Sequence, residues 1–269
     1  MWDEDKHTTG LIDVLNKRAF ELQDYKGVEV EIPAEKADVV AEFNEALKES
    51  VAETSEEMMD KYFSGESFTY PEMIRGLRQG VRELSMFPVF FGSAINCMGS
   101  LMLMDYIVDL LPNPMEGNHH KATTQDGETE EFVVSPGGVP TAYVFKTISD
   151  QYGKYSLIKV LSGEITSDLS LVNARTGNPE KLGRLYQMCG KKATEVKELT
   201  CGDIGAIGKM DKVKTGDTLC DSRKVVALKG IPFAEPCYSK AIAPKTRGQD
   251  DKVAAGLAKM NEEDPSFSV

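Results

Sequence analysis

Apolar and polar residues alternate along 141–148 and again along 155–161, with Gly or Asp close to the ends of both runs. A period of two is typical of half-buried β-strands, and Gly and Asp favour the turns that join them. Many short strands with regular turn signals and no helical period favour a small barrel, since closure leaves no exposed strand edge. We therefore predict a β-barrel over 137–235. Its further strands are expected at 170–173, 182–188, 203–208 and 218–219, and its turns at 162–163, 176–178, 193–200 and 215–217.

A helical spacing of three and four residues appears in the first third of the chain. One helix is expected to open at 32–35 and to end before Gly65, with a face opposite the apolar one that is almost entirely Glu and Lys. A second helix is expected to begin at Thr69, where Glu72 can complete a capping box. Together they predict a helical insert at about 20–85, preceded by a strand over 10–15. The apolar faces are expected to consist of Ala37, Val40, Phe43, Leu47 and Val51 in the first helix and of Ile74, Leu77, Val81 and Leu84 in the second.

A continuous apolar run without alternation occupies 86–91 and is followed by Gly92. Such a run predicts a strand buried on both faces, as in parallel α/β sheets. Gly92, Ser93 and Ala94 then form the loop at its carboxyl end, where open α/β sheets bind their ligands. A helix is expected over 101–111.

The remaining segments are less regular. The stretch 115–136 is polar and without period, so we expect a linker there. A strand over 236–246, a helix over 247–264 and the first residues of another strand at 267–269 predict the opening of a further domain.

Charge is distributed unevenly along the 269 residues, which carry a net charge of -12. The segment 21–66 has 14 acidic and 4 basic residues, whereas 137–247 has 18 basic and 11 acidic residues. The barrel is therefore locally basic, which offers a cationic face to phosphates, although two merely solvated surfaces would show the same asymmetry.

The five cysteines are dispersed and form no Cys-x-x-Cys pair, which is typical of proteins from a reducing cytosol. No apolar run is long enough to span a membrane, so we expect a cytoplasmic protein without a membrane partner. His119 and His120 have no further ligand at a suitable spacing, so no metal site is predicted. Asp203 and Asp217 follow Gly and precede strands, which favours a role in turns over acid catalysis.

Several motifs, in this order and spacing, resemble the translational GTPase family of elongation factor G or its paralogues. The resemblance covers about 10–269. The insert at 32–66 is similar to the accessory insertion of the family's GTPase domain, and 87–94 to the last nucleotide-binding motif of that domain. The stretches 153–163, 201–206 and 215–219 resemble its second domain, while 243–246 and 262–267 resemble the start of its third.

The resemblance implies a multidomain α/β plus all-β protein. It assigns 1–114 to the C-terminal part of a P-loop GTPase domain with its helical insert, 115–136 to a linker, 137–235 to the translation-factor β-barrel, and 236–269 to the truncated opening βα unit of a ferredoxin-like domain. The phosphate-binding pattern G-x-x-x-x-G-K-[ST] is absent from this sequence. Because the magnesium motif, the switch regions and the guanine reader would precede residue 1, we expect a fragment of a larger factor, inactive as a GTPase by itself.

The resemblance also implies the functional residues. Gly92, Ser93 and Ala94 would contact the guanine base in the intact factor, which would hold GTP or GDP with Mg²⁺, while no nucleotide is expected on the fragment. Small-subunit ribosomal RNA is the implied partner of the barrel. For any single lysine the favoured interpretation is a side chain that covers apolar surface or has no role, whereas for the group phosphate contact is favoured. The RNA-contact candidates are Lys154, Lys159, Arg184, Lys191 and Lys192.

The implied function is that of a GTP-dependent ribosomal translocation factor in translation elongation. Alternatives are a ribosome-protection or recycling GTPase of the same family, a non-catalytic RNA-binding barrel with an acidic helical appendage, and a metabolic enzyme with a small-molecule site at Gly92. A fragment that ends within a domain is expected to be monomeric or weakly self-associating.

Overall fold

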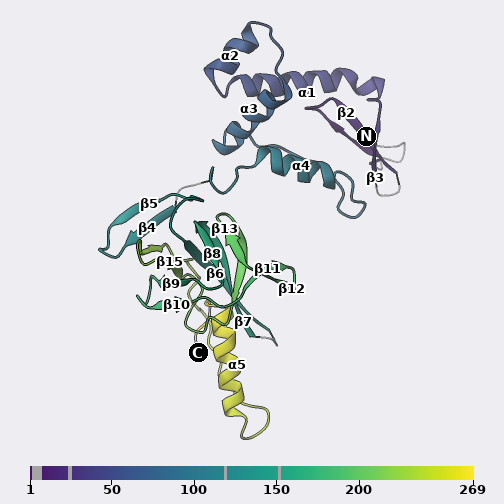
Figure 1. Ribbon diagram of the computed structural model, residues 1–269. Helices are drawn as coiled ribbons and strands as arrows, with labels where there is room; N and C mark the ends of the chain where they lie inside the picture. Colours follow the sequence, from purple (N-terminus) through teal and green to yellow (C-terminus); the bar gives the residue numbers. More distant parts are fainter. Residues whose placement is uncertain (2–7, 24–25, 118–119, 151–152) are drawn as a thin grey trace. The chain divides into compact units, whose positions relative to one another are not determined.

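The computed structural model comprises two units, Met1–Pro112 and Asn113–Val269. The structure describes residues 1, 8–23, 26–117, 120–150 and 153–269 (Figure 1). In the first unit a three-stranded antiparallel sheet precedes four helices. The strands are β1 (Gly10–Asp13), β2 (Arg18–Gln23) and β3 (Lys26–Val30), and the helices are α1 (Ala34–Ala52), α2 (Glu56–Phe63), α3 (Tyr70–Arg82) and α4 (Ser100–Leu110).

The helices begin where capping residues occur. The capping box at Thr69 is confirmed, because the Glu72 carboxylate accepts a hydrogen bond from the Thr69 amide at 2.7 Å. The single helix expected up to Gly65 is instead two helices, since Ser55 is extended and its hydroxyl accepts a hydrogen bond from the Met58 amide at the start of α2. A side-chain cap inside a helical pattern ends one helix and starts the next.

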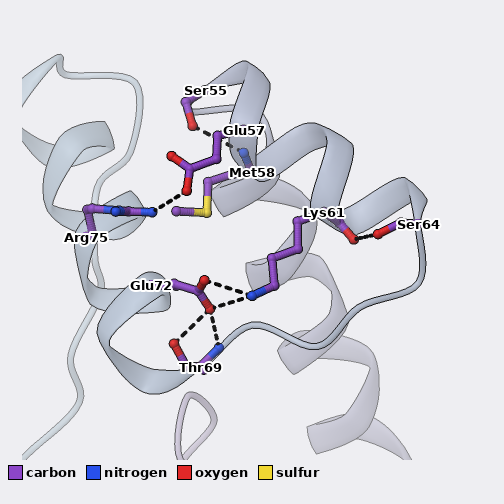
Figure 2. A network of polar contacts seen from close by, with 8 residues as sticks. All are labelled: Ser55, Glu57, Met58, Lys61, Ser64, Thr69, Glu72 and Arg75. Carbon is purple, nitrogen blue, oxygen red and sulfur yellow. Dashed lines mark hydrogen bonds and ion pairs between the residues drawn. The ribbon is translucent and has the colours of Figure 1, made fainter.

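Ion pairs connect α2 to α3 (Figure 2). Lys61 donates to both carboxylate oxygens of Glu72 at 2.7 and 2.9 Å, and Arg75 donates to Glu57 at 3.1 Å. The Lys61 ammonium, followed by the Thr69 amide and hydroxyl, lowers the pKa of Glu72 to about 2. One carboxylate therefore both caps α3 and joins it to α2.

The first unit differs from expectation in further places. On the face expected to be apolar in the first helix, Phe43 is 56% exposed and Ala37 is exposed as well. The predicted insert at about 20–85 begins with β2 and β3, because Phe20 and its neighbours pair across an antiparallel ladder. In addition, Leu84 is 71% exposed, since the backbone turns left-handed there (φ 59°) after the end of α3. The core consists of Val51, Met73, Leu77, Tyr106 and Leu110.

The apolar run 86–91 is not the buried strand that its composition predicts. Phe87, Val89 and Phe91 are 74%, 73% and 78% exposed. None of the residues described by the structure pairs with this run in a sheet. A strand buried on both faces needs sheet neighbours and helices on either side, so composition alone could not produce it.

The second unit is built of short antiparallel strands followed by one helix. Eight strands form a sheet in the order β10-β9-β15-β6-β7-β14-β11-β12, β8 pairs with β13, and β4 lies between β16 and β5. The elements are β4 (His120–Thr124), β5 (Thr129–Phe132), β6 (Thr141–Asp150), β7 (Gly153–Ser162), β8 (Glu164–Thr166), β9 (Ser170–Asn173), β10 (Pro179–Lys181), β11 (Leu185–Cys189), β12 (Lys192–Val196), β13 (Glu198–Thr200), β14 (Ile204–Gly208), β15 (Thr218–Cys220), β16 (Val226–Leu228) and α5 (Asp250–Glu263).

The predicted β-barrel is confirmed. Alternate residues of β7 (Ser156, Ile158 and Val160) point inward, and Ile165 of β8 and Leu199 of β13 close the same core. A register shift between Val144 and Lys146 interrupts the alternation along β6, as expected for a β-bulge. The expected turn over 193–200 instead contains β12 and β13, because 192–196 pairs with β11 and 198–200 with β8.

The linker expected over 115–136 is also corrected, because this segment contains β4 and β5. Ala122, Phe132 and Val134 are buried against Leu161 of the barrel and Val226. Burial of a phenylalanine side chain contributes roughly 1.5–3 kcal/mol, which holds this small sheet on the barrel. The polar composition of the segment hid these three buried positions.

The C-terminal part is only partly as expected. The helix over 247–264 is confirmed as α5. The strand over 236–246 is wrong, since Tyr238 and Ile242 are 76% and 62% exposed and the described residues offer this segment no pairing partner. None of the described helices is long and apolar enough to cross a membrane.

Candidate functional site

The loop Gly92–Ala94 is closed by two backbone hydrogen bonds. The Ser93 amide donates to the Met98 carbonyl and the Met98 amide donates to the Ser93 carbonyl, both at 3.0 Å. A Cβ atom on Gly92 would lie 2.7 Å from the Met98 carbonyl oxygen, so the loop needs glycine for close approach. Gly99 is left-handed (φ 77°) and places the start of α4 directly after this bridge.

The two amides proposed for base contact therefore differ. The Ser93 amide is already satisfied within the loop. Ala94 is exposed, and among the described residues its amide has no hydrogen-bond partner. The neighbouring Ile95 is 91% exposed. A small side chain beside a free N–H group fits a planar heterocycle that presents a carbonyl oxygen, and the Ala94 amide is such a donor.

Lys154 is engaged inside the second unit. Its ammonium lies 3.2 Å from a Glu262 carboxylate oxygen in α5, and its side chain is 12% exposed. It also lies 3.5 Å from the Asp211 carbonyl oxygen. The proposed RNA contact of Lys154 is therefore not available while α5 holds this position.

Lys159 lies in the middle of β7, opposite Tyr143 on β6 and Ile204 on β14, and is half-buried. Burial, followed by the charge of Lys159, lowers the pKa of His120. Lys159 therefore lies close to His120 at the start of β4.

The remaining three candidates lie on the β11–β12 hairpin. Arg184 precedes β11, is 73% exposed in its side chain, and pairs with Glu195 of β12 at 3.1 Å. Lys191 and Lys192 are exposed at the tip, directly after the left-handed Gly190 (φ 57°). The tertiary structure thus brings Arg184, Lys191 and Lys192 onto one element and leaves Lys154 and Lys159 elsewhere.

The spacing of residues did not reveal a buried polar cluster around Asp217 in the barrel. The buried Asp217 carboxylate accepts hydrogen bonds from Arg175, Asn173 and the Lys214 amide. Burial alone would raise the pKa of Asp217, but these donors outweigh it and lower the pKa. The cluster holds the turn at 215–217 to β9, in agreement with a structural role for Asp217. The only signal in the sequence was an aspartate that follows glycine in an expected turn, and this signal does not predict which residues bind the carboxylate.

Metal-binding side chains do not gather in the part of the chain that the structure describes: it contains no group of three or more His, Cys, Asp or Glu residues able to hold an ion. His119 lies outside the described residues, while His120 starts β4.

Comparisons with known proteins agree in both sequence and fold. The sequence model of elongation factor G domain 2 matches residues 140–222, and that of elongation factor G domain III matches residues 233–269. Elongation factor G 1 of Synechocystis sp. (strain ATCC 27184 / PCC 6803 / Kazusa) is 35% identical over 266 residues, which are 97% of this chain and 38% of the relative. Elongation factor G 2 of Shewanella sp. (strain MR-4) is 35% identical over 267 residues, with the same coverage.

A solved structure has a similar fold. The crystal structure of ttk003000868 from Thermus thermophilus matches with a TM-score of 0.81 and 27% identity, over 100% of this chain and 38% of that one. The chain therefore spans little more than a third of the length of the relatives that it matches. On the two domain matches and the identity over nearly all of its residues, the chain belongs to the elongation factor G family.

Proposed function

We propose that this chain acts as part of a GTP-dependent ribosomal translocation factor in translation elongation in the cytoplasm. The observation that carries the proposal is 35% identity over 97% of the chain to proteins named elongation factor G. Two adjoining stretches that match elongation factor G domains support it, because fold alone does not imply function.

Within such a factor we assign the barrel to contact with small-subunit ribosomal RNA. Lys191 and Lys192 support this role best, since both are exposed at the tip of a hairpin that projects two adjacent charges. Arg184 lies at the base of the same hairpin and can exchange Glu195 for a phosphate. Phosphate contact by lysine and arginine supplies affinity that is independent of sequence and falls with salt.

The loop Gly92–Ala94 is assigned to the guanine base of GTP or GDP. Its exposed Ala94 amide can donate one hydrogen bond, worth roughly 1 kcal/mol. Bound Mg²⁺ and nucleotide phosphates would supply the phosphoryl-transfer chemistry, and this sequence lacks the lysine-bearing loop that cradles phosphates. We therefore expect no stable GTP complex with the 269-residue chain.

Binding of the 269-residue chain to isolated small ribosomal subunits, measured across a series of salt concentrations, tests the assignment of the barrel. The variant Lys191→Glu/Lys192→Glu is expected to weaken binding and to reduce the slope of log affinity against log salt by roughly two. The control is Lys252→Glu/Lys259→Glu, which makes the same charge change on exposed positions of α5.

Saturable binding that is weakened only by the hairpin variant supports the proposal. Equal weakening by both variants indicates general repulsion from RNA and contradicts a contact at the hairpin. Absence of binding at low salt contradicts docking by this chain.

A further inference from the structure

The C-terminal end of α5 carries an unfavourable charge for a helix. Glu262, Glu263 and Asp264 are consecutive, and the last turn has no basic residue. Carboxylates at a helix C-terminus repel the partial negative charge of the unsatisfied carbonyl groups. We therefore looked for contacts that these three carboxylates make outside the helix.

Two of these carboxylates contact the end of the β6–β7 hairpin. A Glu263 carboxylate oxygen accepts a hydrogen bond from the Ser149 amide at 2.8 Å, and Glu262 pairs with the Lys154 ammonium at 3.2 Å. Asp264 instead accepts hydrogen bonds from Ser266 in its own turn.

The two donors are neighbours. Ser149 of β6 and Lys154 of β7 are direct cross-strand partners, so their Cα atoms lie about 4.5–5.5 Å apart. β15 pairs with β6 only at Thr141–Tyr143, so it does not cover the edge at Ser149. A backbone N–H group on an open strand edge beside an ammonium group is a typical anion-binding arrangement.

The residues of α5 are exposed or half-buried. None of its 14 residues is buried, all of them lying in the described part of the chain. Val253 and Leu257 are only half-buried. Figure 1 shows α5 meeting the barrel at one end and projecting away from it. Among the described residues, the two carboxylates of Glu262 and Glu263 make the polar contacts that join the C-terminal end of α5 to the β6–β7 hairpin.

We propose that Ser149 and Lys154 form a phosphate-binding site that the chain itself occupies with Glu262 and Glu263. Docked α5 and a bound phosphate group are mutually exclusive, because both need the same ammonium and the same N–H group. The ligand class is a phosphate group, either of an RNA backbone or of a free polyphosphate. α5 thus acts as an autoinhibitory plug that links the position of the helix to the availability of Lys154.

The test is made without ribosomes, so its failure is distinguishable from failure of the proposed function. Inorganic pyrophosphate and a short single-stranded RNA oligonucleotide are titrated separately into the 269-residue chain while the Ser149 amide is followed by NMR. Glu262→Gln/Glu263→Gln removes the plug. Asp250→Asn/Asp251→Asn removes two charges at the opposite end of α5 and is the matched control.

The unplugged variant is expected to bind at least one probe with about tenfold higher affinity than the wild type, with a saturable shift of the Ser149 resonance. Addition of Lys154→Met abolishes that gain. Binding of pyrophosphate indicates a free polyphosphate as ligand, and binding of the oligonucleotide alone indicates an RNA backbone. The proposal is overturned if the control gains as much as the unplugged variant, if Ser149 responds to neither probe, or if the gain survives without Lys154.

Discussion

Replacement of Asp217 by asparagine tests the polar cluster that joins the turn at 215–217 to β9. The Asp217 side chain is 3% exposed. Its Oδ1 accepts a hydrogen bond from Arg175 at 2.6 Å, and its Oδ2 accepts from Arg175, Asn173 and the Lys214 amide at 2.9, 2.7 and 2.9 Å. Asparagine keeps the volume, removes the charge and offers a single acceptor atom to these donors.

The expected loss of stability arises because Arg175 is left without its carboxylate partner. Loss of one partner of a buried ion pair costs about 3–5 kcal/mol, because the other partner keeps its desolvation penalty. Arg175 is 47% exposed and can recover water, so the lower end applies. A cost of about 3 kcal/mol corresponds to about a hundredfold rise in the population of the unfolded barrel.

Reactivity of the Cys220 thiol measures that population. Cys220 is fully buried in the barrel and is expected to react with an alkylating reagent only after unfolding. The rate of Cys220 alkylation is read by peptide mass spectrometry and divided by the rate in the unfolded chain. In Asp217→Asn this ratio should be about a hundred times that of the wild type. Asp221→Asn is the control, because Asp221 pairs with an Arg223 side chain that is 70% exposed and the pair is worth little.

The sign of the pH dependence is a second check. The folded pKa of Asp217 is lowered, so its stabilisation is present above the unfolded pKa near 3.9 and is lost as the pH falls through the folded value. The difference between wild type and Asp217→Asn in urea unfolding, followed by circular dichroism, should therefore shrink below about pH 4. A Cys220 rate no greater than that of Asp221→Asn, or a difference that grows in acid, would refute the reasoning.

Three further outcomes are expected in the first unit. Glu72→Gln should increase amide exchange in α3 above pH 4.5 and much less near pH 2, because the folded pKa of about 2 makes the stabilisation vanish in acid. Gly92→Ala should accelerate exchange of the Met98 amide, since its Cβ would meet the Met98 carbonyl oxygen at 2.7 Å. Tyr106→Phe should cost roughly 1–3 kcal/mol, because the buried Asp13 carboxylate loses a hydrogen bond of 2.7 Å, and thermal unfolding measures the loss.

Each of these outcomes has its own check. Gly137→Ala places a Cβ with no atom within 4 Å, and an equal effect there would exclude the clash as the cause. If the protection of α3 amides, relative to the exchange rate of the unfolded chain, does not fall toward pH 2 in the wild type, the role of Glu72 is contradicted. Burial and then Asp13 raise the pKa of Tyr106, so an absorbance titration that finds this phenol ionised at about pH 11 would contradict the contact.

Local sequence signals predicted much of the fold. The alternation over 155–161 predicted β7 because inward and outward positions differ in burial along a single strand. Thr69 and Glu72 predicted the start of α3 because a capping box involves only four consecutive residues. Motif order indicated elongation factor G, and the comparisons confirmed that family.

Tertiary structure decided the features that depend on partners distant in sequence. The apolar run 86–91 is exposed, because burial requires neighbouring strands that its own residues cannot supply. The polar stretch 115–136 contributes Phe132 to a core, because its partners come from β7 and β16. From the sequence, Lys154 is expected to be a free cation on the surface. In the structure its ammonium pairs with the carboxylate of Glu262, which lies far away in the chain. The sequence shows which side chains are charged, but the tertiary structure determines which group of opposite charge lies beside each of them.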